Sequence, residues 1–182
     1  TTVEIPDEGF RFEHRSDETL CVQVGQLDKL REGQGKDGCL SHLKNCTVFI
    51  LDVSEAIRID QLESCKVYVG PVAGSVHLQN GTKCTFMIAS RQIRIHDSYD
   101  CDYYLRVASN PIFEDCSRLR FAPYNLYYPE LAGQMVRAGL EKLENKWQQV
   151  DDFKWHRAQH SPNWSELAAA DMQTEVEGSA AV

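Results

Sequence analysis

The middle of the chain carries a repeated pattern of hydrophobic and polar positions. Four cysteines recur at intervals of about 19 residues, and apolar residues stand at the second and fourth positions after each. These repeats are Cys46 with Val48 and Ile50, Cys65 with Val67 and Val69, Cys84 with Phe86 and Ile88, and Cys101 with Tyr103 and Leu105. Apolar residues that recur at a period of two predict a strand whose alternate side chains face inward.

The other half of each repeat contains a second apolar pair: Ile57 with Ile59, Val76 with Leu78, and Ile93 with Ile95. Two short strands in a unit of about 19 residues predict a stacked solenoid, because one unit alone buries too little apolar surface. Equivalent strands would pair in parallel, so we expect an all-β fold, a right-handed parallel β-helix. An antiparallel sandwich would need frequent hairpin turns, and Asn80-Gly81 is the only Asn-Gly pair.

The repeat changes toward its end and sets the expected domain boundaries. After Cys116 the apolar pair, Leu119 and Phe121, comes one position later, which predicts a bulge or the end of the solenoid. We expect a partly flexible lead-in over 1–17, the solenoid over 18–130 and an extension over 131–167. The extension has helical spacing near Leu131 and clustered tryptophans, so we expect it to pack along the solenoid wall or over its open end. Residues 168–182 are small, polar and acidic and predict a disordered tail.

Composition and motifs exclude several classes of function. The net charge of −8 argues against general attraction to nucleic acid or to an anionic membrane. No apolar run is long enough to span a membrane. Seven cysteines without a C-x-x-C pair are typical of reduced thiols, which favours a cytosolic location. No phosphate-binding glycine loop or histidine metal motif occurs, and we expect neither a bound metal nor a cofactor. The chain begins at Thr1 rather than Met, so we interpret it as a fragment.

The segment Ser90–His96 carries the candidate chemistry. If Ile93 and Ile95 face inward, then Gln92, Arg94 and His96 project together from the outer face. A guanidinium is always charged and forms two parallel hydrogen bonds to phosphate oxygens, so such a row can meet an anion. Glu114, about one repeat later, would lie near Arg94 and hold its side chain. From the pattern alone, an exposed strand with an ordinary surface ion pair is the simpler interpretation.

Arg91 shares the inward parity of Ile93. Either the chain turns a corner at this position, or Arg91 lies at the margin of the core.

These segments, taken in order, resemble the tubulin-binding cofactor C family of domains. The matching pieces cover about residues 18–167 and are Gly70-Pro71-Val72, Gly74-Ser75-Val76, Gln92-Ile93-Arg94-Ile95-His96, Pro111 to Asp115, Phe121-Ala122-Pro123-Tyr124, Trp147, Val150-Asp151-Asp152-Phe153, Trp155 and Ser161-Pro162-Asn163-Trp164. Members fold as right-handed parallel β-helices, so the resemblance implies the same fold as the repeat.

The resemblance also implies a function, GTPase activation. Arg94 would be an arginine finger that completes the partner's active site, with Gln92 supporting it and Glu114 orienting it. Arg91, His96 and Phe121 are further candidate partner contacts, and Arg91 stands where the family usually has Gln. The chain would then have no catalytic site of its own, since GTP and Mg²⁺ belong to the partner.

The family acts on αβ-tubulin with cofactors D and E and triggers GTP hydrolysis in β-tubulin, which implies a cytoplasmic, cytoskeleton-associated protein. We expect a monomer, because the acidic surface and the C-terminal extension discourage edge-to-edge stacking of solenoids. Two alternatives stay open. A sister branch activates Arf-like small GTPases, and cyclase-associated proteins carry a related β-helix that binds actin without a finger.

Overall fold

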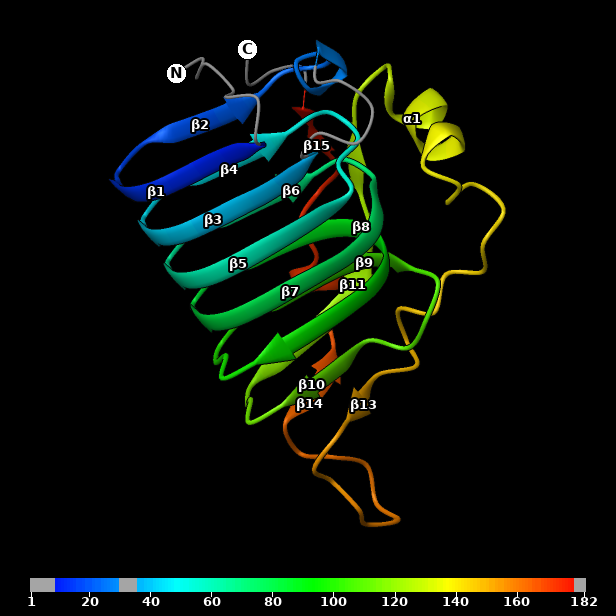
Figure 1. Cartoon of the computed structure of the whole chain (residues 1–182). Coiled ribbons are helices and arrows are strands. Elements are labelled where there is room, and N and C mark those ends of the chain that lie inside the picture. Colours follow the sequence, from blue (N-terminus) through cyan, green and yellow to red (C-terminus); the bar gives the residue numbers. More distant parts are fainter. Residues whose placement is uncertain (1–8, 30–35, 179–182) are drawn as a thin grey trace.

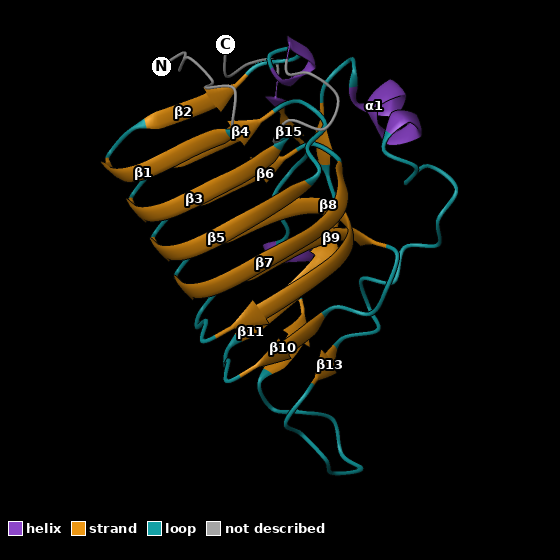
Figure 2. Cartoon of the chain, in the orientation of Figure 1, coloured by secondary structure: helices purple, strands orange, loops and turns teal. Residues whose placement is uncertain are grey.

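The structure is a computed structural model that describes residues 9–29 and 36–178. Parallel strands stack from β1 and β2 at one end to β13 and β14 at the other (Figure 1). Strands predominate, and the described residues include one short α-helix beside the stack (Figure 2). The predicted all-β fold with parallel pairing is therefore confirmed.

Each turn of the chain contributes one strand to each of two walls. The front wall contains β1 (Phe10–Ser16), β3 (Asp37–Lys44), β5 (Ala56–Glu63), β7 (Val72–Thr82), the second half of β8 (Thr85–His96), β10 (Ile112–Glu114) and β13 (Asp151–Asp152). The back wall contains β2 (Thr19–Val22), β4 (Thr47–Ile50), β6 (Lys66–Val69), the first half of β8, β9 (Asp102–Val107), β11 (Leu119–Pro123) and β14 (Trp164–Glu166).

The core lies between the walls. It consists of columns of inward-facing side chains, each column formed by residues at equivalent positions in successive strands. One column on the back wall runs through Val48, Val67, Phe86, Tyr103 and Phe121, all buried. Its aromatic members stack, with ring centroids 5.2 Å and 5.3 Å apart. Stacked rings at this spacing add to the burial of their apolar area. The period-two prediction for these strands is confirmed.

The cysteine column behaves as predicted until its last member. Cys46, Cys65, Cys84 and Cys101 lie one above another, but Leu119 rather than Cys116 occupies the next place. Cys116 lies in the neighbouring column, beside Ser98. The shift of the apolar pair after Cys116 is therefore neither a bulge nor the end of the stack, because the repeat resumes at Leu119.

The stack begins earlier than the expected boundary at residue 18. Strand β1 pairs with β3 along its length, and Phe10 and Phe12 are buried. Arg11 between these two phenylalanines faces outward, as in a strand, but no cysteine marks this segment and we expected a lead-in. Residues 1–8 of that segment lie outside the described part of the chain.

The outer surface of the back wall is also apolar, and the end of the chain covers it. This surface consists of Cys21, Phe49, Tyr68, Met87, Tyr104 and Ala122, which pack against Leu126, Tyr128, Leu167, Met172 and Val176. Strand β15 (Val176–Glu177) pairs with β12 (Leu126–Tyr127), after the short 3-10 helix η2 (Ala169–Asp171).

The tail expected at 168–182 is thus ordered over its described part, residues 168–178. The backbone N–H of Gln173 donates to the Tyr104 hydroxyl over 2.8 Å, and the Gln173 amide donates to the Tyr68 hydroxyl. An apolar wall surface that must be covered, together with these polar anchors, orders a segment whose composition alone predicted disorder. Residues 179–182 lie outside the described part.

The extension over 131–167 adds a further turn to the stack. Helix α1 (Leu131–Arg137) is short and is followed by Gly139 at a φ of 72°, a conformation that favours glycine. Strands β13 and β14 then pair with β10 and β11, and Trp147, Val150 and Trp164 pack against the core. No helix within residues 9–29 and 36–178 is long and apolar enough to cross a membrane.

Candidate functional site

Strand β8 turns a corner and carries the candidate residues on its second half. Ser90 pairs with Val107 on the back wall and with Val72 on the front wall. Its buried hydroxyl donates to the Gln92 carbonyl over 3.0 Å. The inward side switches from even to odd residue numbers at this corner, so the first alternative stated for Arg91 holds.

Arg91 is exposed at the corner. Its guanidinium lies 3.4 Å from the carbonyl oxygen of Gly139, just beyond the end of α1. This contact ties Arg91 to the extension at the corner, away from the outward row that contains Arg94.

Arg94 lies in the outward row that the sequence predicted. Ile93 and Ile95 are buried, whereas Gln92 and Arg94 are exposed and His96 is half-buried. The backbone of this half of β8 is paired on both sides, by β7 and by β10. A side chain on a doubly paired strand starts from a fixed backbone, which limits the entropy lost when it engages a partner.

The structure pairs Glu114 with His96 rather than with Arg94. The residue beside Arg94 on β10 is Ile112, and Glu114 lies beside His96, whose Nδ1 is 2.9 Å from the Glu114 carboxylate. The expectation that Glu114 lies next to Arg94 is therefore wrong by two positions. The turn that ends at Ile112 is shorter than the interval from Arg94 to Glu114, on which that expectation rested.

Arg94 makes no hydrogen bond or ion pair within the described part of the chain. The carboxylates on the following strands are engaged elsewhere: Glu114 with His96 at 2.9 Å, Asp115 with Lys154 at 2.7 Å, and Asp151 with Asn110 at 3.1 Å. The hydrogen bond with Asp115 raises the pKa of Lys154. The Arg94 guanidinium is consequently free to meet an external anion.

Phe121 does not belong to this surface. Its side chain is 0% exposed and lies between Tyr103 and Trp164 in the core. A partner could reach it only by opening the stack, so its assignment as a partner contact is wrong. Its parity with Leu119 on the same strand explains the burial, since both continue inward columns.

Phe153 is a surface residue that the sequence interpretation missed. It is 64% exposed, and its backbone N–H donates to the Phe113 carbonyl, so it continues the front wall beyond β10. It lies in the extension that we expected to pack along the solenoid wall or over its open end. Its charged neighbours Asp152 and Lys154 gave no signal of this exposure, because alternation of charged and apolar residues predicts that the apolar one faces inward.

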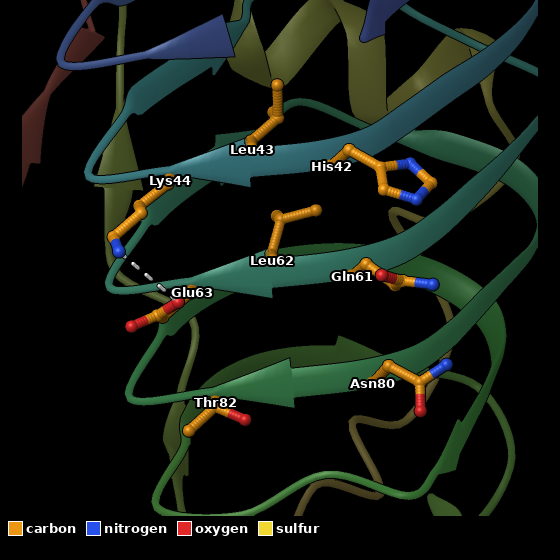
Figure 3. A pocket seen from close by; sticks show the side chains of 8 residues that line it. All are labelled: His42, Leu43, Lys44, Gln61, Leu62, Glu63, Asn80 and Thr82. Atoms are coloured by element: carbon orange, nitrogen blue, oxygen red, sulfur yellow. Dashed lines mark ion pairs between the residues drawn. The ribbon is translucent and has the colours of Figure 1, made fainter. Parts of the chain in front are cut away.

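A hollow of about 730 Å³ lies elsewhere, along the corners that join the front wall to the back wall (Figure 3). His42, Gln61 and Asn80 line one side of it, one above another in successive turns. All three have positive φ, as the corners require, and Lys44 and Glu63 form a loose exposed ion pair at 3.8 Å. The positive φ at each corner accounts for the way His42, Gln61 and Asn80 line up along this hollow. Among the described residues, no group of three or more His, Cys, Asp or Glu side chains could hold a metal.

Fold and surface together define an all-β protein of stacked parallel strands with a fixed outward row of polar side chains. At the centre of that row is Arg94, which has no ion-pair partner among the residues that the structure describes. The family described as "Tubulin binding cofactor C" matches residues 35–153. The chain belongs to this family.

Curated relatives with tubulin in their names share this part of the chain. "Tubulin-folding cofactor C" of Arabidopsis thaliana is 46% identical over 128 residues, which are 70% of this chain and 37% of that protein. "Tubulin-specific chaperone C" of Homo sapiens is 41% identical over 133 residues, covering 72% of this chain and 38% of that protein. The chain thus spans less than two fifths of the length of these two relatives.

Two further similarities extend the comparison. "Protein XRP2" of Xenopus laevis is 33% identical over 145 residues, 79% of this chain and 40% of that protein. The solved structure of tubulin binding cofactor C from Leishmania major superposes with a TM-score of 0.61 at 28% identity, covering 69% of this chain and 87% of that one.

Proposed function

We propose that the chain acts in tubulin folding, together with cofactors D and E, as a GTPase-activating domain. In this role it inserts Arg94 into the nucleotide site of β-tubulin. The observation that carries the proposal is the exposed Arg94 guanidinium on a doubly paired strand, without an ion-pair partner among the described residues. The names of the relatives from Arabidopsis thaliana and Homo sapiens support tubulin as the partner.

The chemistry needs little more than a positioned charge. Negative charge grows on the phosphoryl and bridging oxygens as GTP is hydrolysed, and a preorganised guanidinium stabilises it. An arginine finger supplied in trans accelerates hydrolysis by about 10³–10⁵, or roughly 4–7 kcal/mol of barrier. GTP and Mg²⁺ would belong to the partner, so the chain would activate without a catalytic site or cofactor of its own.

The neighbours of Arg94 would divide the remaining roles. Gln92 faces the same side and would contact the nucleotide edge. Glu114 would orient His96 rather than the finger itself, because its carboxylate is 2.9 Å from the imidazole. Arg91 would contact the partner at the corner, where its hydrogen bond to Gly139 also fixes it.

Three further points belong to the proposal. We infer that the strands wind as a right-handed β-helix, the hand that parallel crossover connections adopt. The expected location is the cytoplasm, at the cytoskeleton. A second candidate partner is an Arf-like small GTPase, which the same chemistry would serve.

Phosphate release from GTP-bound αβ-tubulin with cofactors D and E tests the proposal, with and without the chain. Arg94→Ala should remove most of the stimulation, while the fold stays intact because this side chain is exposed and makes no hydrogen bond or ion pair among the described residues. Arg118→Ala is the matched control, since Arg118 is also exposed and pairs only with Asp100 at a corner, among the described residues.

Each outcome is informative. Stimulation that survives in Arg94→Ala would contradict the finger. Stimulation of an Arf-like GTPase but not of tubulin would contradict the partner. Binding to tubulin without any stimulation would favour a non-catalytic binding module of the cyclase-associated protein type.

A further inference from the structure

A column of basic side chains leads away from Arg94 across the front wall. Register places Arg11, Cys39, Arg58, His77 and Arg94 side by side on β1, β3, β5, β7 and β8. Neighbouring strands are about 4.8 Å apart, so Arg58 starts about 10 Å from Arg94. In a chain with a net charge of −8, an outward column with three arginines and a histidine departs from the average surface.

The central members of this basic column are exposed and uncompensated. Arg58 and His77 make no hydrogen bond or ion pair with residues in the described part of the chain. Arg11, at the far end, pairs with Glu13 at 3.2 Å. In the next column Asp60 accepts a hydrogen bond from the Asn80 amide. Arg58 and Arg94 thus carry positive charges without an ion-pair partner among the described residues, and Asp60 keeps its negative charge in the next column.

A hollow beside Arg58 and His77 offers only donors and neutral groups. It measures about 230 Å³, and its polar lining comes from Arg58, His77, Gln79 and His96. None of the described residues that line it carries a carboxylate. The hollow on the opposite side of the column, about 270 Å³, includes Asp37, which would repel an anion. An anionic group is therefore attracted to the first hollow, where the Arg58 guanidinium can bind a carboxylate through two hydrogen bonds.

We propose that the front wall over β5 and β7 is a docking surface for an acidic segment of the GTP-bearing protein partner, with Arg58 and His77 as its main contacts. The proposal rests on the proposed function for the identity of that partner. A docked glutamate side chain in the hollow would hold the partner one or two strands from Arg94. Charge complementarity of this kind steers encounter and fixes register.

An oligoglutamate peptide tests the surface without any nucleotide chemistry. The peptide should bind the chain at low salt and dissociate as salt is added, since the contact is exposed. Arg58→Ala should weaken binding about fivefold, and Arg58→Lys should restore only part of the affinity, because the charge remains but the two parallel hydrogen bonds are lost. Lys66→Ala is the matched control: it removes one exposed charge from the back wall and should leave binding unchanged.

Two peptide results would overturn the proposal: no binding to the wild-type chain, or equal losses in Arg58→Ala and Lys66→Ala. Unchanged thermal unfolding of Arg58→Ala would show that the fold is intact.

The phosphate-release assay separates this proposal from the finger. Arg58→Ala should raise the tubulin concentration that gives half-maximal stimulation about fivefold and leave the maximal rate unchanged, whereas Arg94→Ala should lower the maximal rate. A lower maximal rate in Arg58→Ala would contradict a docking role. If the wild-type chain stimulates no hydrolysis, the proposed function fails, and the peptide result alone decides the docking surface.

Discussion

The buried cysteines hold the corners of the stack as small hydrogen-bonding residues. In successive turns the thiol donates to the carbonyl two positions earlier, as from Cys65 to Glu63 and from Cys84 to Thr82, each over 3.3 Å. The residue before each of these cysteines has a positive φ. Cysteine fits because it is small, apolar and a weak donor, and a larger side chain would separate the turns.

Burial keeps most of the thiols from reacting. Burial raises the pKa of Cys116 to about 12. The hydrogen bond with Cys84 lowers the pKa of Cys65, yet Cys65 is 1% exposed and out of reach of a reagent. Cys39 alone among the seven is more than marginally exposed, on the front wall.

Alkylation of the native chain should therefore modify Cys39 first and leave the other six thiols intact until the chain unfolds. Mass spectrometry after iodoacetamide treatment at mildly alkaline pH measures this, and Cys39→Ser should abolish the first label. Rapid labelling of two or more cysteines before unfolding would contradict the packing described for the corners.

The corners between the walls were the part of the fold that the sequence predicted least well. Each turn from front to back wall uses two residues with positive φ, three positions apart, such as Gln61 with Ser64 and Asn80 with Lys83. Within residues 9–29 and 36–178, eight of the twelve such non-glycine residues are Asn, Asp or His, the types that tolerate this conformation. We interpreted only Asn80-Gly81 as a turn signal, so the regular spacing of the others did not contribute to the prediction.

Glycine at one of these corners should stabilise the chain. Gln61 is exposed and has a φ of 56°, which costs an L-residue about 1–2 kcal/mol, so Gln61→Gly should raise the free energy of unfolding by roughly 0.5–1 kcal/mol after the entropic cost of glycine. Urea unfolding measures the difference.

Gln79→Gly is the matched control, because Gln79 is also exposed but lies within β7 in ordinary strand conformation. It should lower the free energy of unfolding by about 0.5–1 kcal/mol. Equal effects of the two substitutions would contradict the assignment of strain to the corners.

The strands and the exposed row were predictable because burial alternates along each strand. The inward positions of Ile93 and Ile95 determine the outward direction of Arg94, as their spacing predicted. The partner of Glu114 was not predictable, because the turns of the stack differ in length and a register error of two positions moves a side chain to the next outward place. The strand from Phe10 to Ser16 was missed because no cysteine marks it.

At the scale of the whole molecule, the two walls have different outer surfaces. The chain's own end covers the back wall, through Met172, Val176 and the hydrogen bonds of Gln173 to Tyr68 and Tyr104. No strand or helix in the described part of the chain covers the front wall over β5, β7 and β8 (Figure 1). The order of the covering segment follows from contacts between segments far apart in the sequence, which composition cannot convey. This asymmetry leaves one wall available to a partner, and Arg94 lies on it.

As an arginine finger, Arg94 should stabilise the phosphoryl group during transfer and so bind the transition state more tightly than the ground state. The most direct measurement is binding of the chain to αβ-tubulin, with cofactors D and E, in the GDP form and in the GDP–aluminium fluoride form that imitates this state. Wild type should bind the aluminium fluoride form at least about tenfold more tightly. Arg94→Ala should lose that preference and keep its affinity for the GDP form, and Arg94→Lys should resemble Arg94→Ala because the forked geometry is lost. An Arg94→Ala chain that retains the preference would contradict the role of Arg94 as an arginine finger.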